Sequence, residues 1–473
     1  MKLFRGYAVL SAGQIASRLL GLLAFAWLAR ALDPEAYGAA EYVIGIALLV
    51  GTLIDGGSGV VGLRRATQDP GGLSGLAFQI LAARLMFTAI GVPILALVVL
   101  STAISAVPVG LVWLFAASLL AAPWRQEWMF QATGRTGNVA LAQIVRAGVF
   151  AALVWLLVRG PRDLIAVGWA EIGAVAALTG YCLYVQHTRV TAVRLWGSFR
   201  GFAALVKESA VAGAGNGVWA MSQYAPLLMI GTLMGGVQTA WFAAAARVVG
   251  SLMVVPYVYH YGLYPAVSRA AAHDDGELRD LLARSCRVAA WGGVFLALAL
   301  TLFAEPLMVL AMGAKLAPAA PMLRIMAWIL PVSLCSGHAY WALAAVGAQT
   351  RLLWVQIAGL GAVVAVGSLL GEMLAGLGYA LASLASAIVL WVLAHLFAAR
   401  RGLHPPPFRR VLMPGALAAI VLVVAQLTES GSWSSLAWLA VYAAVAPLLD
   451  RRLLRDFSAL GRSRLGPGSA RHA

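Results

Sequence analysis

Five arginines interrupt long apolar segments of this sequence, where a charged guanidinium group is energetically unfavourable. They are Arg18, Arg84, Arg146, Arg247 and Arg324. A charged side chain at the centre of a bilayer costs about 2.5 to 3.5 kcal/mol on insertion scales, and less near a helix end, where the side chain reaches the interface. The depth of each arginine in its segment therefore decides whether it calls for a functional explanation.

Arg18 is the deepest of the five. It lies about eleven residues into its apolar run, which at roughly 1.5 Å per residue places it near the middle of a bilayer. Arg247 follows, about seven residues from the end of its segment. We expect both to line a polar cavity, the alternative being a structural pair with a carboxylate. Arg324 lies near a helix end and is expected to snorkel, whereas Arg84 and Arg146 fit snorkelling and cavity lining equally well.

Acidic residues within the apolar segments are fewer than the basic ones. Asp55, Glu41 and Glu171 are candidates for pairing with an arginine or for ion coupling. Since bases outnumber acids there, an interior cavity would carry a net positive charge. Such a cavity would bind an anion.

Amide and aromatic side chains are the other candidates for lining the same cavity. They include Gln14, Asn216, Gln223, Tyr224, Tyr257 and His338. The alternative for each is a hydrogen bond between helices or a place in an interfacial aromatic belt. The histidines and three cysteines show no metal-ligand spacing, so we expect no metal and no cofactor. The sequence also lacks GxSxG, Walker and HExxH motifs, and an enzyme is not expected.

Composition indicates the class of protein that must position these side chains. Hydrophobic residues make up 62% of the 473 residues and charged residues only 11%, and the mean hydropathy is +0.86. These values lie far outside the range of soluble domains. The net charge of +16 comes from basic residues that flank apolar segments, which is typical of membrane topology rather than nucleic-acid binding.

Apolar stretches of membrane-spanning length recur from end to end, so we predict an all-α integral membrane protein with about 14 transmembrane helices. The predicted spans lie near residues 7–31, 37–62, 76–100, 108–131, 138–158, 164–186, 205–233, 239–265, 287–311, 321–346, 352–372, 376–398, 411–428 and 433–449. We interpret the first as an uncleaved span rather than a signal peptide, because its apolar run is too long.

Basic residues are distributed unequally between the two predicted sides of the membrane. One side carries almost all of them, whereas the other carries only Arg30, Arg159, Arg162 and Lys315. The positive-inside rule therefore predicts that both termini are cytoplasmic. We expect two six-helix lobes around a central cavity, related as a parallel transporter repeat. The predicted domains are residues 1–190 and 191–400 for the lobes, 401–450 for two additional helices and 451–473 for a basic cytoplasmic tail.

Four stretches resemble one family of transporters. The stretch "ARALDPEAYGAAEYVIGIALLVGTLIDGGSGVVGLRRA" resembles the second-helix region of the polysaccharide-transport branch of the multidrug/oligosaccharidyl-lipid/polysaccharide exporter superfamily, and "QIASRLLGLL" before it resembles the first helix. "APWRQEWMFQATGRTGNVALAQIVR" is similar to the turn between helices four and five, and "GTLMGGVQTAWFAAAARVVGSLMVVPYVYHYGLYPAVSRA" to the start of the second half. The stretch "YAPLLMIG" departs from the family, because Ala225 and Pro226 lie where many members have an acid.

The resemblance implies a flippase that moves a polyprenyl-diphosphate-linked oligosaccharide from the cytoplasmic to the outer leaflet of a bacterial cytoplasmic membrane by alternating access. Arg18 and Arg247, with Arg84 and Arg146, would bind the diphosphate headgroup. The amide and aromatic residues named above would contact sugars, and Asp55, Glu41 or Glu171 would carry any ion coupling. Membrane lipid, a polysaccharide polymerase and other glycan-assembly proteins are the implied partners. The alternatives are a drug exporter of the same superfamily and a membrane glycan ligase.

Overall fold

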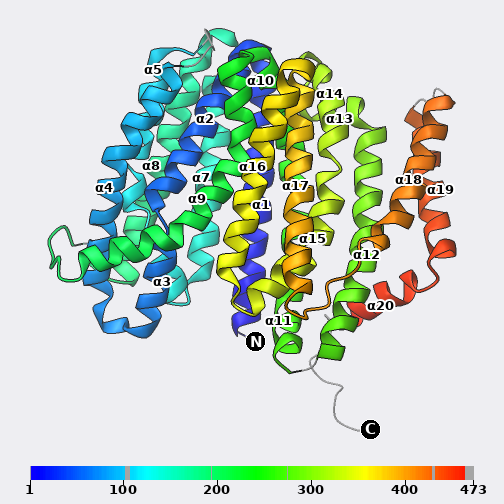
Figure 1. The fold of residues 1–473 in the computed structure, drawn as a ribbon. Helices are drawn as coiled ribbons and strands as arrows, with labels where there is room; N and C mark the ends of the chain where they lie inside the picture. Colours follow the sequence, from blue (N-terminus) through cyan, green and yellow to red (C-terminus); the bar gives the residue numbers. More distant parts are fainter. Residues whose placement is uncertain (1, 102–106, 193, 274, 429–431, 464–473) are drawn as a thin grey trace. The chain divides into compact units, whose positions relative to one another are not determined.

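The computed structural model describes residues 2–101, 107–192, 194–273, 275–428 and 432–463, and within these ranges it contains helices and no strands (Figure 1). Eleven of the described helical segments are long and apolar enough to cross a membrane. The other three predicted spans, near 108–131, 205–233 and 433–449, also fall on helices, but these are interrupted, less apolar or shorter. The all-helical class is confirmed, and the total of fourteen spans stays a prediction.

Contacts divide the chain into two compact units. The first unit comprises Met1–Ser251, Met308–Ala319 and Gly367–Tyr379, and the second comprises Leu252–Leu307, Ala320–Val366 and Ala380–Ala473. The predicted lobes 1–190 and 191–400 and the predicted segments 401–450 and 451–473 stay predictions, and residues 464–473 of that tail lie outside the described residues.

Most helices fall within one unit. Those of the first unit are α1 (Lys2–Ala31), α2 (Pro34–Asp55), α3 (Ser58–Gln68), η1 (Pro70–Gly72), α4 (Leu73–Leu100), α5 (Val109–Leu119), η2 (Ala122–Trp124), α6 (Glu127–Ala132), α7 (Thr136–Leu157), η3 (Pro161–Asp163), α8 (Leu164–Arg189), α9 (Phe202–Leu233), α10 (Gly236–Leu252) and η4 (Ala314–Ala319). Those that lie wholly or mainly in the second are α11 (Val254–His273), α12 (Asp275–Leu302), α14 (Ala320–Met326), α15 (Ile329–Ala345), α16 (Gln349–Leu374), α17 (Gly376–Ala399), α18 (Arg409–Leu427), α19 (Ser432–Leu449) and α20 (Leu453–Ser463). Helix α13 (Ala304–Met312) is divided between the two units after Leu307. The carboxyl-terminal parts of α13 and α16 and the first residues of α17 belong to the first unit.

The predicted span near 37–62 consists of two helices. Asp33 caps α2 by accepting a hydrogen bond of 2.8 Å from the backbone N–H of Ala36, as helix-capping aspartates do. The helix ends where Gly56 and Gly57 adopt φ values of +50° and +75°, which glycine tolerates best. A Cβ atom on Gly57 would lie 2.3 Å from the backbone nitrogen of Gly213 in α9. The close approach of α9 therefore also requires glycine at this break.

Helices α1 and α7 run parallel and in contact. A Cβ atom on Gly13 would meet Ala140, one on Gly148 would meet Leu20, and the indole of Trp27 donates a 2.8 Å hydrogen bond to the carbonyl of Val158. These three contacts fix the register of the two helices. Each residue of α1 lies level with a residue about 127 to 131 positions later in the chain, in or just after α7. The register places side chains of α1 and α7 at known relative depths.

The second unit has its own core around α12. Trp291 and Leu298 of α12 pack with Val421 of α18 and Tyr442 of α19, and α18 and α19 lie side by side (Figure 1). The guanidinium of Arg287 pairs with Asp450 at 3.1 Å and Asp456 at 2.5 Å. These contacts attach the last three helices to α12.

Candidate functional site

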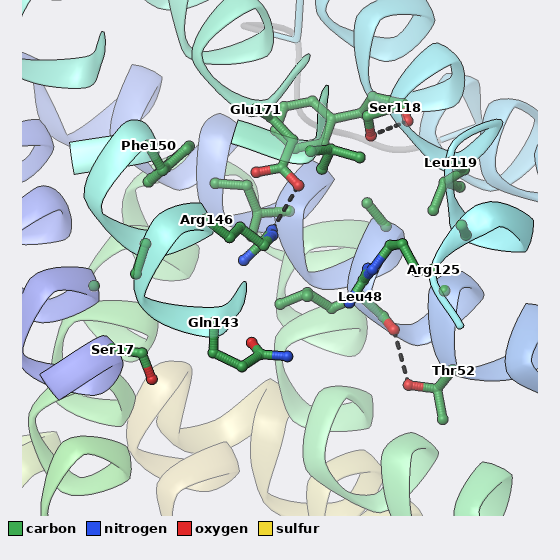
Figure 2. Close-up of a pocket in the computed structure, with 18 of the residues that line it drawn as sticks. Ser17, Leu48, Thr52, Ser118, Leu119, Arg125, Gln143, Arg146, Phe150 and Glu171 are labelled. Carbon is green, nitrogen blue, oxygen red and sulfur yellow. Dashed lines mark hydrogen bonds and ion pairs between the residues drawn. The ribbon is translucent and has the colours of Figure 1, made fainter. Parts of the chain in front are cut away.

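A cavity of about 560 Å³ lies within the first unit and is lined by seven charged side chains. Its wall is formed by residues of α1, α2, α5, α7, α8 and α10 and by the η2 and α6 region. The charged residues on the wall are Arg18, Asp55, Arg125, Glu127, Arg146, Glu171 and Arg247. Figure 2 shows Arg146 of α7, with Gln143 of the same helix near it, and Arg125 from the segment between η2 and α6 on another side of this space.

Arg247 of α10 is held by a carboxylate from α2. Its Nε and Nη2 atoms donate to Glu41 at 2.9 and 2.7 Å, an arrangement of the strong charge-assisted kind. The Tyr37 hydroxyl donates to Glu41 Oε1 at 2.8 Å, and the guanidinium carbon lies 3.5 Å from the centroid of the Phe25 ring. Glu41 is only 2% exposed, so it supports Arg247 from behind the cavity wall.

Two further pairs lie on the side of the cavity formed by α6, α7 and α8. Arg146 Nη2 lies 2.6 Å from Glu171 Oε1, and this pair is visible in Figure 2. Glu127 accepts a 2.7 Å hydrogen bond from the amide nitrogen of Gln143 and lies 3.5 Å from Arg125 Nη2. The charges on this side are therefore largely compensated.

Arg84 lies behind the wall rather than on it. The residue is 6% exposed, and its guanidinium pairs with Asp55 and donates to the Ser58 hydroxyl at 2.8 Å and to the carbonyl of Arg125 at 2.6 Å. These partners lie on both sides of the Gly56–Gly57 break and on the loop before α6. Arg84 thus orients Asp55 and fixes the helix break.

Arg18 differs from the other arginines of the cavity. Its Nη1 donates a 3.2 Å hydrogen bond to the carbonyl of Gly250. Among the side chains that the structure describes, Arg247, Arg146 and Arg125 each pair with a carboxylate, and Arg18 does not. Because Gly250 follows Arg247 by three residues, Arg18 contacts α10 about one helical turn from the residue that carries the other guanidinium. The cavity therefore presents one uncompensated cation beside a compensated one.

The predicted site residues fall into three groups. Arg18, Arg146, Arg247, Asp55 and Glu171 lie on the cavity wall. Arg84 and Glu41 lie behind it as ion-pair partners. The remaining predictions do not coincide with the wall: Gln14, Asn216, Gln223 and Tyr224 belong to the first unit but not to the lining, and Tyr257 and His338 belong to the second unit. The binding roles of all these residues stay predictions.

Six polar residues of the wall were not predicted from the sequence: Ser17, Thr52, Ser118, Arg125, Glu127 and Gln143. Arg125 was counted as a topological charge, and the others were not singled out. The signal for Arg125 and Glu127 was present in "APWRQEW", where proline and charge interrupt the predicted span near 108–131. The structure breaks the helix there, between α5 and α6, and Arg125 and Glu127 from this break lie on the cavity wall.

Comparison with known proteins identifies related chains and folds. The family described as "Polysaccharide biosynthesis protein" matches residues 3–271. No curated protein matches the chain. The structure of "Lipid II flippase MurJ, inward closed conformation" has a TM-score of 0.74 at 12% identity, covering 97% of this chain and 100% of that one.

Two further solved structures share the fold. An inward-facing multidrug resistance MATE family transporter of the MOP superfamily has a TM-score of 0.69 at 14% identity, covering 82% of this chain and 94% of that one. A MOP superfamily transporter from Pyrococcus furiosus, described as having a binding pocket of reverse polarity, has a TM-score of 0.59 at 16% identity, covering 84% and 95%. The resemblance found in the sequence is confirmed, and the fold is that of these transporters.

Proposed function

Because this chain belongs to the polysaccharide biosynthesis protein family, in the polysaccharide-transport branch of the multidrug/oligosaccharidyl-lipid/polysaccharide exporter superfamily, we propose that it is a flippase for polyprenyl-diphosphate-linked oligosaccharides. The chain is a multi-pass membrane protein. We place it in the bacterial cytoplasmic membrane with both termini cytoplasmic, as the distribution of basic residues predicts.

The observation that carries this proposal is the pair of arginines on α1 and α10. Arg18 has no carboxylate partner among the described side chains, and Arg247 leaves Nη1 outside its bonds to Glu41. A diphosphate offers several anionic oxygens and is bound well by arginine. Two guanidinium groups on the wall of one cavity would contact both phosphates of one headgroup.

Transport of such a headgroup needs a polar path. Sugar hydroxyls and a diphosphate would lose their hydration in hydrocarbon, which is strongly unfavourable without replacement hydrogen bonds. The cavity supplies these groups while the prenyl chain stays in lipid. A membrane potential that is negative inside favours outward movement of an anion by about 2.3 kcal/mol per charge per 100 mV, so transport would not require a coupling ion.

Export of cationic drugs is the second candidate, because MATE transporters share the fold. A cation would need a carboxylate free to bind it. Each acid on the described wall, Asp55, Glu127 and Glu171, has an arginine partner. The charge of the cavity therefore favours an anionic cargo.

Mass spectrometry of polyprenyl-diphosphate lipids tests the proposed function. In cells that lack this chain, we expect a sugar-bearing carrier to accumulate several-fold, and wild-type protein to restore the normal level. An unchanged carrier pool in the deletion strain, with increased sensitivity to cationic drugs, would instead identify a drug exporter.

The proposed transport cycle requires the cavity to open toward the outer face of the membrane. Beyond Phe25, the last residue of α1 on the wall, Leu28, Leu32 and Tyr37 are 0% exposed. A Cβ atom on Gly38 of α2 would lie 1.9 Å from the carbonyl oxygen of Gly236 at the start of α10. This tightly packed region closes the end of the first unit that we assign to the outer face.

The carboxyl ends of α1 and α13 meet at this closed end. Arg30 donates to the carbonyls of Ala311 at 2.9 Å and Leu310 at 2.5 Å. Lys315 donates in return to the carbonyls of Arg30 at 3.2 Å and Leu32 at 3.1 Å. Terminal carbonyls of a helix lack helical partners and carry partial negative charge. Each helix end is therefore neutralised by a cation that the other segment supplies.

Loss of this reciprocal contact is expected to expose the cavity to the outside. In cells carrying Thr52→Cys on the cavity wall, we expect Arg30→Gln with Lys315→Gln to raise labelling by a membrane-impermeant maleimide roughly fivefold, the equivalent of about 1 kcal/mol. Arg159→Gln is the control, because Arg159 is an exposed arginine on the same predicted side. Equal labelling in the double variant and the control would show that these contacts do not hold the outer end closed.

A further inference from the structure

The cavity contains a second polar centre that the proposed diphosphate contacts do not use. It consists of Glu127 at the start of α6 and Gln143 on α7, joined by a 2.7 Å hydrogen bond from the Gln143 amide nitrogen to Glu127 Oε1. Both residues lie on the wall of the same cavity as Arg18. Resting on the proposed function, we propose that Glu127 and Gln143 bind the sugar nearest the diphosphate, and that this sugar is a neutral pyranose.

The register of α1 and α7 places this centre relative to the arginines. Gly13 meets Ala140 and Leu20 meets Gly148, so Gln143 lies at a level nearer the amino end of α1 than Arg18 does. Arg247 lies on the other side of Arg18, over the ring of Phe25. Along the cavity the order is therefore Arg247, Arg18 and then Gln143 with Glu127. A diphosphate held by the two arginines would extend its first sugar toward the Gln143 and Glu127 level.

The chemistry of the two ends differs in the way that such a headgroup requires. A diphosphate only accepts hydrogen bonds, and the Arg18 and Arg247 end presents donors. A pyranose hydroxyl both donates and accepts. Glu127 offers carboxylate acceptors, and Gln143 retains its carbonyl oxygen and a second N–H. Figure 2 shows the Gln143 amide in the interior beside Arg146. This end matches hydroxyl groups and is unsuited to a second phosphate.

The carboxylate also restricts the kind of sugar. Arg125 lies 3.5 Å from Glu127. Because Arg125 already compensates the charge of Glu127, it is not available to pair with a second carboxylate. Arg146 is likewise engaged by Glu171 at 2.6 Å. A uronic acid at this level would place its carboxylate beside Glu127, while the diphosphate occupies Arg18, the one uncompensated arginine of the described wall. Like charges at close range are unfavourable. Neutral sugars are therefore expected next to the diphosphate.

Binding to two defined lipids tests this proposal. For the full chain in lipid nanodiscs, we expect undecaprenyl diphosphate bearing one glucose to bind about fivefold more tightly than bare undecaprenyl diphosphate, and undecaprenyl diphosphate bearing one glucuronic acid to show no such gain. Gln143→Leu and Glu127→Gln should each remove the gain in affinity that glucose gives over the bare lipid. Glu127→Gln keeps the size of the side chain, so the test does not depend on a variant that alters packing.

The control is Gln131→Leu, because Gln131 is an exposed amide on α6 that does not line the cavity. It should keep the full preference for the glucose-bearing lipid. The proposal is overturned if the wild type binds both lipids equally, if glucuronic acid gives the same gain as glucose, or if both wall variants keep the preference. A wild-type chain that binds neither diphosphate lipid would instead contradict the proposed function itself.

Discussion

Arg18→Ala is expected to reduce transport of the lipid-linked oligosaccharide by about 10- to 150-fold, while the protein stays folded. Charge-assisted hydrogen bonds contribute about 1.5 to 3 kcal/mol each, and a diphosphate would lose at least one of them. No described carboxylate loses an ion-pair partner when Arg18 is removed, so stability should not fall. The measurements are the level of sugar-bearing carrier in complemented cells and the thermal unfolding temperature of the purified variant.

Two variants control this prediction. Arg18→Lys keeps the charge but lacks the planar fork of donors, and we expect it to retain partial transport. Arg324→Ala removes an exposed arginine of α14 in the second unit, and we expect normal transport. If Arg18→Ala transports at the wild-type rate, the uncompensated cation of the cavity is not a contact for the headgroup.

Glu41→Ala is expected to lower the free energy of unfolding by about 3 to 5 kcal/mol, because it leaves the guanidinium of Arg247 partly buried without its carboxylate. The reverse variant, Arg247→Ala, should be similarly destabilising, since Glu41 is 2% exposed and would keep only the hydroxyl of Tyr37. Either single variant would lose transport for a structural reason. Single substitutions at this pair therefore cannot identify a substrate contact.

The double variant Glu41→Leu with Arg247→Met separates the two effects. Replacing both members of a buried ion pair by apolar residues is often neutral or stabilising, so we expect unfolding close to that of the wild type but transport still lost. Asp280→Ala serves as the stability control. Asp280 lies 3.5 Å from Arg284, and both side chains are exposed. Exposed ion pairs of this kind contribute less than about 1 kcal/mol to stability. Recovery of transport in the double variant would exclude Arg247 from headgroup binding.

The membrane class and the helical fold followed from properties that are local in sequence. A membrane span must hydrogen-bond its own backbone polar groups, which favours a helix, and must stay apolar for its full length. Both requirements concern residues that are close together in the sequence. Breaks within a span were harder to predict. The Gly56–Gly57 break depends on the backbone of Gly213 in α9, which approaches only in the folded protein. Apolar length likewise predicted one continuous span near 108–131, where the structure has the separate helices α5 and α6.

Some features of the candidate site also depend only on local sequence, whereas others depend on how the helices pack. The sequence by itself determined that Arg18 and Arg247 are deep in apolar segments, because the unfavourable insertion of a buried charge depends only on depth. Only the tertiary structure decided which charges are neutralised: Glu41 reaches Arg247 across 206 positions of sequence, and Arg84 turns behind the wall to hold Asp55. It also brought Glu127 and Gln143 onto the wall in place of Gln223 and Asn216. The direction in which a polar side chain faces depends on how its helix packs and rotates against its neighbours, and spacing along one helix does not contain that information.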